Sequence, residues 1–228
     1  MKPKLFRPTF PFYITQHFDQ NEACIEAIDD VVMTKLKIVG KVDGVCPVGY
    51  RELYPLLGLK GHPGLDIHAP DGTPLYACGD GQVISIQTEA GRGIGFDVVS
   101  NEEYILFDKP CHIKWRYWHL KKLNVYLGQR VFVGDVMGWA DSTGFSAGSH
   151  LHFEVKPVVK NAVGEWVNMR QGNGYFGAID FEPYLSTVYA LDAKKPLIPP
   201  IVVAEVVKLP EPTRTNIFIQ ILKAFGLL

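Results

Sequence analysis

The sequence lacks an excess of charge of either sign. Its 228 residues carry 23 Lys and Arg against 24 Asp and Glu, a formal net charge of -1. A basic excess is what concentrates a protein on nucleic acid or anionic lipid, so this composition does not support polyanion binding. The sequence also lacks an internal repeat, a low-complexity tract and any apolar run close to the roughly 20 residues of a membrane span. We therefore expect no nucleic-acid partner and no transmembrane segment.

Two further features are missing. The first residues, Met1 to Pro8, are positively charged but have neither the uninterrupted apolar run nor the small-residue cleavage site of a secretory signal. The cysteines form no CxxC pair and are widely spaced, which favours buried free thiols over disulfides or a thiolate metal site. These cysteines are Cys24, Cys46, Cys78 and Cys111.

Turn-forming residues are abundant, with 22 Gly and 16 Pro, and they separate short runs of strand-forming residues. We expect a mainly β fold: an antiparallel β-sheet groove or sandwich core with peripheral loops and short helices. The predicted strands cover residues 75–78, 82–87, 95–100, 104–107, 113–118, 131–133, 151–155 and 165–168.

Composition divides the chain into three parts. Residues 1–49 are expected to form an N-terminal extension packed on the core, with a short helix from Asn21 to Met33. Residues 50–190 hold the main domain. Residues 191–228 are a Pro-rich linker followed by an apolar C-terminal segment, which is too short to span a membrane. We expect this tail to mediate self-association or docking to an assembly partner, because exposed apolar patches mark contact surfaces.

Three clusters carry chemistry. In the first, His62 and Asp66 lie four positions apart around Gly64, which lets the backbone turn tightly. In the second, His150 and His152 alternate along a predicted strand, so both project from the same face. The third places His119 at the end of a hydrophobic run, where its position alone says little.

Two histidines and one aspartate match the requirement of a catalytic zinc site. Such sites take three protein ligands, often imidazole nitrogen and carboxylate oxygen, and leave one position for water. Taken singly, each residue has a simpler explanation, since a turn contact or a strand face also accounts for it.

In sequence order, the clusters resemble the lysostaphin-type zinc endopeptidases of peptidoglycan, whose hallmarks are H-x-G-x-D and H-x-H. Here His62-Pro63-Gly64-Leu65-Asp66 and His150-Leu151-His152 supply the two motifs. The further matches in order are residues 69–77 (APDGTPLYA), 79–83 (GDGQV), 117–120 (YWHL), 128–131 (GQRV), 134–138 (GDVMG), 142–144 (STG) and 148–155 (GSHLHFEV). The resemblance covers about 100 residues, from His62 to Val155.

The resemblance implies a site, a cofactor and an activity. His62, Asp66 and His152 are then the Zn²⁺ ligands, and His119 and His150 are the non-ligand histidines. We expect His150 to act as general base and His119 as oxyanion stabiliser or proton donor, and the two roles could be exchanged. The implied activity is hydrolysis of peptide bonds in the cross-bridges or stem peptides of bacterial peptidoglycan.

Other polar residues near the motifs have less specific expectations. Glu154 shares a strand face with His152, so it either orients an imidazole or lies at the rim of the core. His68 is expected at the rim of the site, and His17 and His112 are expected to be structural. Residues 19–57 and 89–112 depart from the family pattern, which leaves the shape of the groove open.

Two other classes of protein fit the same residues less well. An inactive family member that binds wall or regulates a hydrolase would have lost ligands, whereas all five positions are filled here. A structural zinc site needs a fourth ligand, for which Cys78 and Cys111 are the candidates. Without an export signal, we expect a protein made in the cytoplasm that reaches the wall after phage lysis, as an endolysin, or as a virion component. The alternative is a bacterial protein that is exported by another route.

Overall fold

The computed structural model describes residues 2–20, 54, 58–144, 146 and 148–193. All of them belong to one compact unit, Met1–Lys195. The predicted helix at 21–33, Cys24, Cys46 and most of the 191–228 tail lie outside the described residues. The division into three parts therefore remains a prediction.

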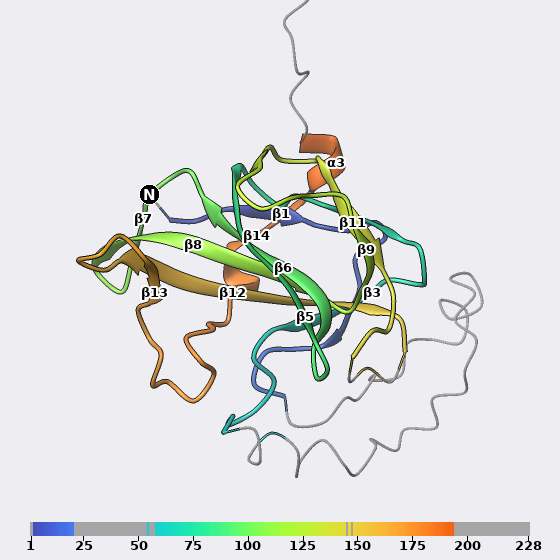
Figure 1. Cartoon of the computed structure of the whole chain (residues 1–228), viewed down its shortest axis with the longest axis horizontal. Coiled ribbons are helices and arrows are strands. Elements are labelled where there is room, and N and C mark those ends of the chain that lie inside the picture. Colours follow the sequence, from blue (N-terminus) through green and yellow to red (C-terminus); the bar gives the residue numbers. More distant parts are fainter. Residues whose placement is uncertain (1, 21–53, 55–57, 145, 147, 194–228) are drawn as a thin grey trace, which may run out of the picture. The chain divides into compact units, whose positions relative to one another are not determined.

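Short strands dominate the described residues (Figure 1). They are β1 (Leu5–Arg7), β2 (Ile14–Gln16), β3 (Leu65–His68), β4 (Pro74–Tyr76), β5 (Gly81–Glu89), β6 (Gly93–Ser100), β7 (Tyr104–Leu106), β8 (Lys109–Trp118), β9 (Leu120–Leu123), β10 (Arg130–Val131), β11 (Val136–Ala140), β12 (His150–Lys160), β13 (Trp166–Asn168) and β14 (Leu185–Tyr189). A 3₁₀ turn, η1 (Glu182–Tyr184), and a short helix, α3 (Ala190–Ala193), complete the elements.

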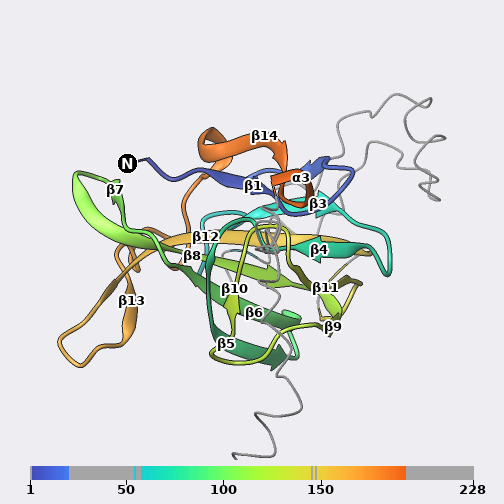
Figure 2. The ribbon, with the colours of Figure 1, turned by 90° about the horizontal axis from the view of Figure 1, so that it is seen from above.

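The strands form one large sheet and two small ones. The large sheet has the order β10-β5-β6-β8-β12-β3-β2, with β13 paired to β12 and β7 to β8. Its pairs are antiparallel throughout. The small sheets are β4-β11-β9 and the parallel pair β1-β14. Figure 2 shows β1, β14 and α3 on one side of β12 and β8, with β6 and β5 on the other side.

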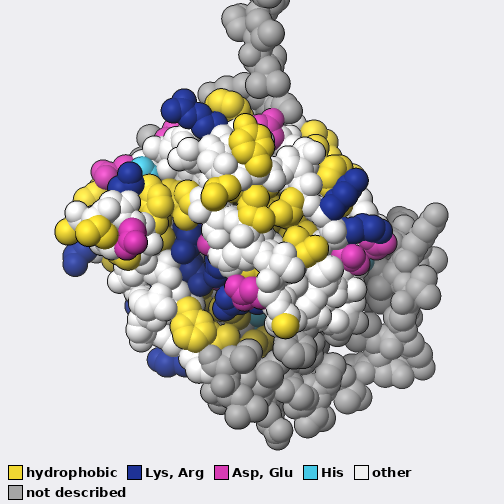
Figure 3. Space-filling model, viewed as in Figure 1, with side chains coloured by type: hydrophobic (Ala, Val, Ile, Leu, Met, Phe, Trp, Pro, Cys, Tyr) yellow, Lys and Arg dark blue, Asp and Glu magenta, His cyan; other side chains and the backbone are white. Residues whose placement is uncertain are grey.

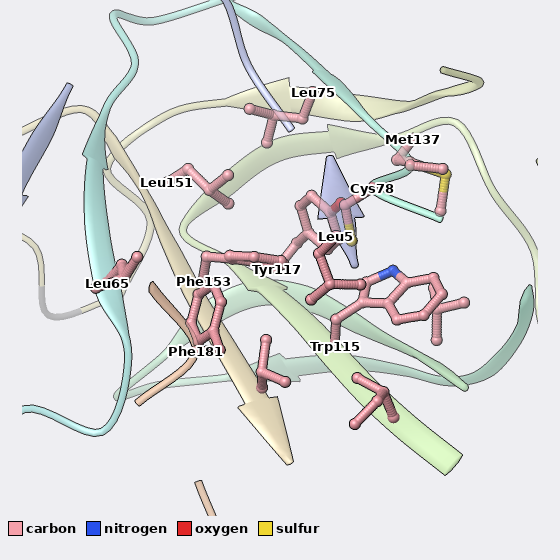
Figure 4. Packing of buried hydrophobic residues seen from close by; sticks show 14 of the residues in the cluster. Leu5, Leu65, Leu75, Cys78, Trp115, Tyr117, Met137, Leu151, Phe153 and Phe181 are labelled. Atoms are coloured by element: carbon pink, nitrogen blue, oxygen red, sulfur yellow. The ribbon is translucent and has the colours of Figure 1, made fainter. Parts of the chain in front are cut away.

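The hydrophobic core lies on one face of the large sheet, against the two small sheets. Leu151, Phe153 and Val155 alternate along β12 and are at most 2% exposed. Tyr117 and Trp115 of β8 join them from the neighbouring strand (Figure 4). Since strand side chains alternate between faces, the intervening residues of β12 and β8 must project from the opposite face. That opposite face carries polar residues, among them His152 and Glu154 of β12 and Arg116 of β8.

The predicted fold class is confirmed, because the described residues are mainly antiparallel sheet with very little helix. Some details were wrong. Several strands, among them β9, β11 and β14, were not predicted, and β12 does not end at Val155 but continues to Lys160. The strand passes Pro157 because the carbonyl of that residue still accepts a hydrogen bond from Met169 N at 3.0 Å, although its nitrogen has no proton to donate.

Cys78 and Cys111 are free and buried, as expected. Burial raises the pKa of the Cys78 thiol to about 12, which makes it a poor nucleophile and a poor metal ligand. Both lie in the core cluster, on the face of the sheet opposite the polar residues. In the described part of the chain, no helix has the length and apolar character required to cross a bilayer.

Candidate metal centre

Strands β3 and β12 bring the two sequence motifs together. They pair antiparallel, with Asp66 directly opposite His152. Gly64 precedes β3 at a point of close approach, where a Cβ atom would lie 2.5 Å from the carbonyl oxygen of Phe153. Only glycine allows the chain to pass this close to β12, which places His62 beside the strand pair.

Three donor atoms then converge. His62 Nε2 lies 2.9 Å from His152 Nδ1 and 3.1 Å from Asp66 Oδ1, and His152 Nδ1 lies 2.8 Å from Asp66 Oδ1. Zinc bonds of about 2.0–2.1 Å in tetrahedral geometry separate two donors by about 3.3 Å. The triangle is slightly tighter than this value. Its size and its donor types therefore fit a zinc ion bound on one side of the three atoms.

In both ligand histidines, the ring nitrogen that faces away from the triangle donates a hydrogen bond to the protein. His62 Nδ1 donates a hydrogen bond to the backbone carbonyl of His17 at 3.1 Å. His152 Nε2 donates to Glu154 Oε1 at 3.2 Å. Since the accepting groups take up the ring N–H, the lone pairs of His62 Nε2 and His152 Nδ1 point toward the shared space. Both rings are oriented for metal binding in the described structure.

The electrostatics of the centre favour a cation between the ligands. Burial favours the neutral acid, but His62 and His150 hold the pKa of Asp66 well below its ordinary value. Burial opposes the charged form of His152 too, yet hydrogen bonds to Asp66 and Glu154 raise its pKa to about 9. Without metal, a proton therefore occupies the space between these groups. A metal ion would displace that proton, because imidazole binds metals only in its neutral form.

Two further histidines stand beside the ligands. The ring centroids of His119 and His150 are 4.7 Å apart, and His119 lies 5.9 Å from the His152 ring. His119 Nδ1 donates to the Thr143 carbonyl at 2.7 Å, and His150 Nδ1 donates to the Gly148 carbonyl at 2.8 Å. Each ring therefore keeps Nε2 for other partners. His150 Nε2 is 3.4 Å from Asp66 Oδ1, which places it next to the ligand triangle.

The environments of these two histidines differ. Burial, reinforced by His150 and His152, lowers the pKa of His119 to about 4. Burial also acts to lower the pKa of His150, but the Asp66 carboxylate outweighs it and raises that pKa. His119 is thus neutral across the physiological range. The pKa of His150, in contrast, depends on the negative charge of Asp66.

All five histidine and aspartate residues singled out from the sequence lie in this cluster. His68 lies beside it, paired with His150 across β3 and β12. His112 lies apart, with its ring against Trp166. His17 combines two contacts, because its ring pairs with Glu182 at 2.6 Å while its carbonyl supports His62. The supporting carbonyls of His17 and Thr143 were not anticipated, since every residue type carries a carbonyl and sequence gives no signal for it.

Known proteins resemble the segment that carries this cluster. The model of peptidase family M23 matches residues 60–169. The glycyl-glycine endopeptidase ALE-1 of Staphylococcus capitis is 39% identical over 104 residues, which are 44% of this chain and 26% of that protein. The peptidoglycan DD-endopeptidase ShyB of Vibrio cholerae is 37% identical over 112 residues, 49% of this chain and 24% of that protein. The chain thus spans about a quarter of the length of these relatives.

Among solved structures, the catalytic domain of lysostaphin from Staphylococcus simulans aligns with a TM-score of 0.42 and 26% identity, covering 55% of this chain and 79% of that one. The matched segment 60–169 contains every member of the histidine and aspartate cluster. Residues 60–169 are therefore a peptidase family M23 domain, homologous to lysostaphin and to the glycyl-glycine endopeptidase ALE-1.

Proposed function

We propose that the protein is a zinc-dependent endopeptidase that hydrolyses peptide bonds in bacterial peptidoglycan. The observation that carries this proposal is the triangle of donor atoms from His62, Asp66 and His152, with two further imidazoles beside it. Membership of a peptidase family supports the reaction type. The names of the relatives, a glycyl-glycine endopeptidase and a peptidoglycan DD-endopeptidase, support the substrate class.

His62, Asp66 and His152 would hold the zinc ion. When bound, zinc lowers the pKa of water toward neutrality and polarises a carbonyl group, which is the chemistry that amide hydrolysis needs. The protein contributes orientation. The His17 carbonyl and the Glu154 carboxylate fix the two ligand rings, so the donor atoms need little rearrangement on binding.

His150 and His119 would move protons. Each has its Nδ1 proton committed to a backbone carbonyl, so proton uptake and release take place at Nε2. His150 is the better candidate for general base, since its Nε2 lies beside the carboxylate of a ligand. Neutral His119 can first accept a proton at Nε2 and then donate it to the departing amine, or stabilise the oxyanion once protonated. Kinetic measurements on variants of the two histidines distinguish these roles.

Digestion of purified peptidoglycan tests the proposal. The full-length protein, loaded with zinc, should release soluble fragments whose masses correspond to cleaved peptide bonds. Treatment with a chelator should abolish release, and added zinc should restore it. Glycan-bond cleavage, or undiminished hydrolysis by metal-free protein, would contradict the proposal.

A further inference from the structure

The polar face of the large sheet continues beyond the metal centre as a row of compensated charges. Glu154 of β12 pairs with Arg116 of β8, and Arg116 pairs in turn with Asp97 of β6. Arg116 Nε donates to Asp97 Oδ1 at 2.7 Å, and one of its terminal nitrogens donates to Glu154 Oε2 at 3.3 Å. All three residues are at most 7% exposed. In this row each charge has a partner of opposite sign.

The next row along the strands holds two cations. Lys156 of β12 lies directly opposite Lys114 of β8. Like charges at directly opposite positions destabilise a sheet, so folding alone gives no reason for this pair. Lys156 turns back to Glu154, with Nζ 2.9 Å from Oε2. Lys156 is therefore already neutralised by a carboxylate from the neighbouring row.

The ammonium group of Lys114 has no counter-ion among the described residues. It forms no ion pair and no hydrogen bond with any residue that the structure describes. Burial lowers its pKa to about 8, so its ammonium group still carries charge at neutral pH. Among the described residues, the carboxylates that act on the Lys114 ammonium are those of Asp97 and Glu154, which also face Arg116 and Lys156. The group as a whole therefore has one uncompensated positive charge.

A hollow of about 530 Å³ adjoins the position of Lys114, although Lys114 itself does not line it. Its lining includes Val99, His112, Lys160 and Trp166, together with one carboxylate, that of Glu103. Val99 pairs directly with Lys114 across β6 and β8, and His112 lies two residues away on the same face of β8. Figure 3 shows Lys and Arg side chains in dark blue, with an acidic group beside them, in a depression over the middle of the sheet.

We propose that Lys114 binds a carboxylate of the peptide substrate and thereby selects acidic peptides. This inference rests on the proposed function, because it treats the polar face as the groove that receives the peptide. Trp118 pairs with His152, and Lys114 lies four residues further along β8, about 13 Å at a rise of about 3.3 Å per residue. The carboxylate would thus lie about four extended residues from the cleaved bond. A single surplus charge suits one carboxylate better than a doubly charged phosphate.

The test compares two Lys114 variants and one control variant on two substrates. Lys114→Met removes the charge and Lys114→Arg keeps it, while Lys109→Met changes an exposed lysine of the same strand as a control. Each full-length, zinc-loaded protein is given native peptidoglycan and peptidoglycan whose carboxylates have been converted to carboxamides with carbodiimide and ammonia. This treatment leaves phosphate groups in place. We expect Lys114→Met to lose about tenfold or more in kcat/KM on native substrate, the scale of one charge-assisted hydrogen bond, and nothing on amidated substrate.

Thermal unfolding separates this role from a structural one. Lys114→Met should be at least as stable as the wild type, since it relieves the like-charge pair with Lys156. A lower melting temperature, equal losses on both substrates, or an undiminished rate on native substrate would overturn the carboxylate site. So would a dependence on Lys114 that survives amidation, which would indicate a phosphate ligand.

Binding without hydrolysis distinguishes this inference from the proposed function. Zinc-loaded protein carrying His150→Ala, with or without Lys114→Met, is sedimented with the two insoluble preparations at low temperature. Retention that depends on both Lys114 and free carboxylates supports the carboxylate site. If the wild type then cleaves neither preparation, the proposed function fails and the carboxylate site stands. Equal retention of both proteins on native peptidoglycan overturns the carboxylate site alone.

Discussion

His152 Nε2 lies 3.2 Å from Glu154 Oε1, on the side of the ring opposite the contact between Nδ1 and Asp66. The two residues are two apart on β12 and share one face of the strand. Glu154 is itself held by Lys156 and Arg116. Although burial favours the neutral acid, these cations keep the pKa of Glu154 well below its ordinary value. An ionised carboxylate only accepts hydrogen bonds, so the proton on this side of the ring must belong to His152.

Replacing this carboxylate should weaken metal binding without removing a ligand. We expect Glu154→Gln to lower zinc affinity by about 10- to 100-fold, because the amide no longer stabilises the tautomer that binds through Nδ1. Competition with a chromogenic chelator measures the affinity directly. Glu165→Gln, an exposed change in the β12-β13 connection, is the control. Unchanged affinity in Glu154→Gln, with the fold intact by circular dichroism, would show that Glu154 does not position the ligand.

Substitution of His150 and of His152 should have different effects, because only His152 is expected to bind the metal ion. His152→Ala should lose both zinc and hydrolysis, since it removes one corner of the donor triangle. His150→Ala should keep zinc and lose turnover by about 10²-fold or more. Zinc content by atomic absorption and initial rates on peptidoglycan test both. Equal zinc loss in the two variants would mean that His150 is also a ligand.

His119 should behave like His150 in metal content. His119→Ala leaves all three donor atoms in place, so zinc should remain bound while hydrolysis falls by about 10²-fold or more. The ratio of the two effects on kcat and KM then distinguishes a proton donor from a group that only binds substrate. If His119→Ala were fully active, His150 alone would account for proton transfer.

Close packing under the site should make Gly95 intolerant of a side chain. A Cβ at this position would lie 2.3 Å from a ring carbon of Trp118 and 2.5 Å from the Tyr117 carbonyl oxygen. We expect Gly95→Ala to lower the free energy of unfolding by about 1–3 kcal/mol, the usual cost of overpacking. Gly172→Ala, where no atom lies within 4 Å, should change it by less than about 0.5 kcal/mol. Chemical denaturation compares the two. Similar unfolding midpoints for both variants would contradict this packing.

Some of the site followed from the sequence because strand geometry is local. His150 and His152 were expected on one face, since strand side chains alternate, and the same rule put Glu154 within reach of His152. The convergence of His62 with this face was predicted from motif resemblance and not from geometry. It depends on Gly64 passing close to Phe153, a contact between segments about 90 residues apart.

Other parts of the site depend on tertiary pairing that no local pattern reports. The compensation of Arg116 by Glu154 and Asp97 requires the registers of β8 with β12 and with β6. The backbone carbonyls of His17 and Thr143 act through position alone, so residue identity carries no signal for them. Strand β11 was missed because its glycine and its preceding turn residues are typical of a loop.

The eleven residues of β12 carry His150, His152, Glu154 and Lys156 on one face and the core residues Leu151, Phe153 and Val155 on the other. A shift of this strand by a single residue would present leucine, phenylalanine and valine to the groove and bury the imidazoles. Secondary structure content would hardly change, yet every donor from this strand would be lost. Zinc affinity is therefore a sensitive measure of correct strand alignment. It would distinguish a properly folded preparation from a misaligned one that circular dichroism cannot tell apart.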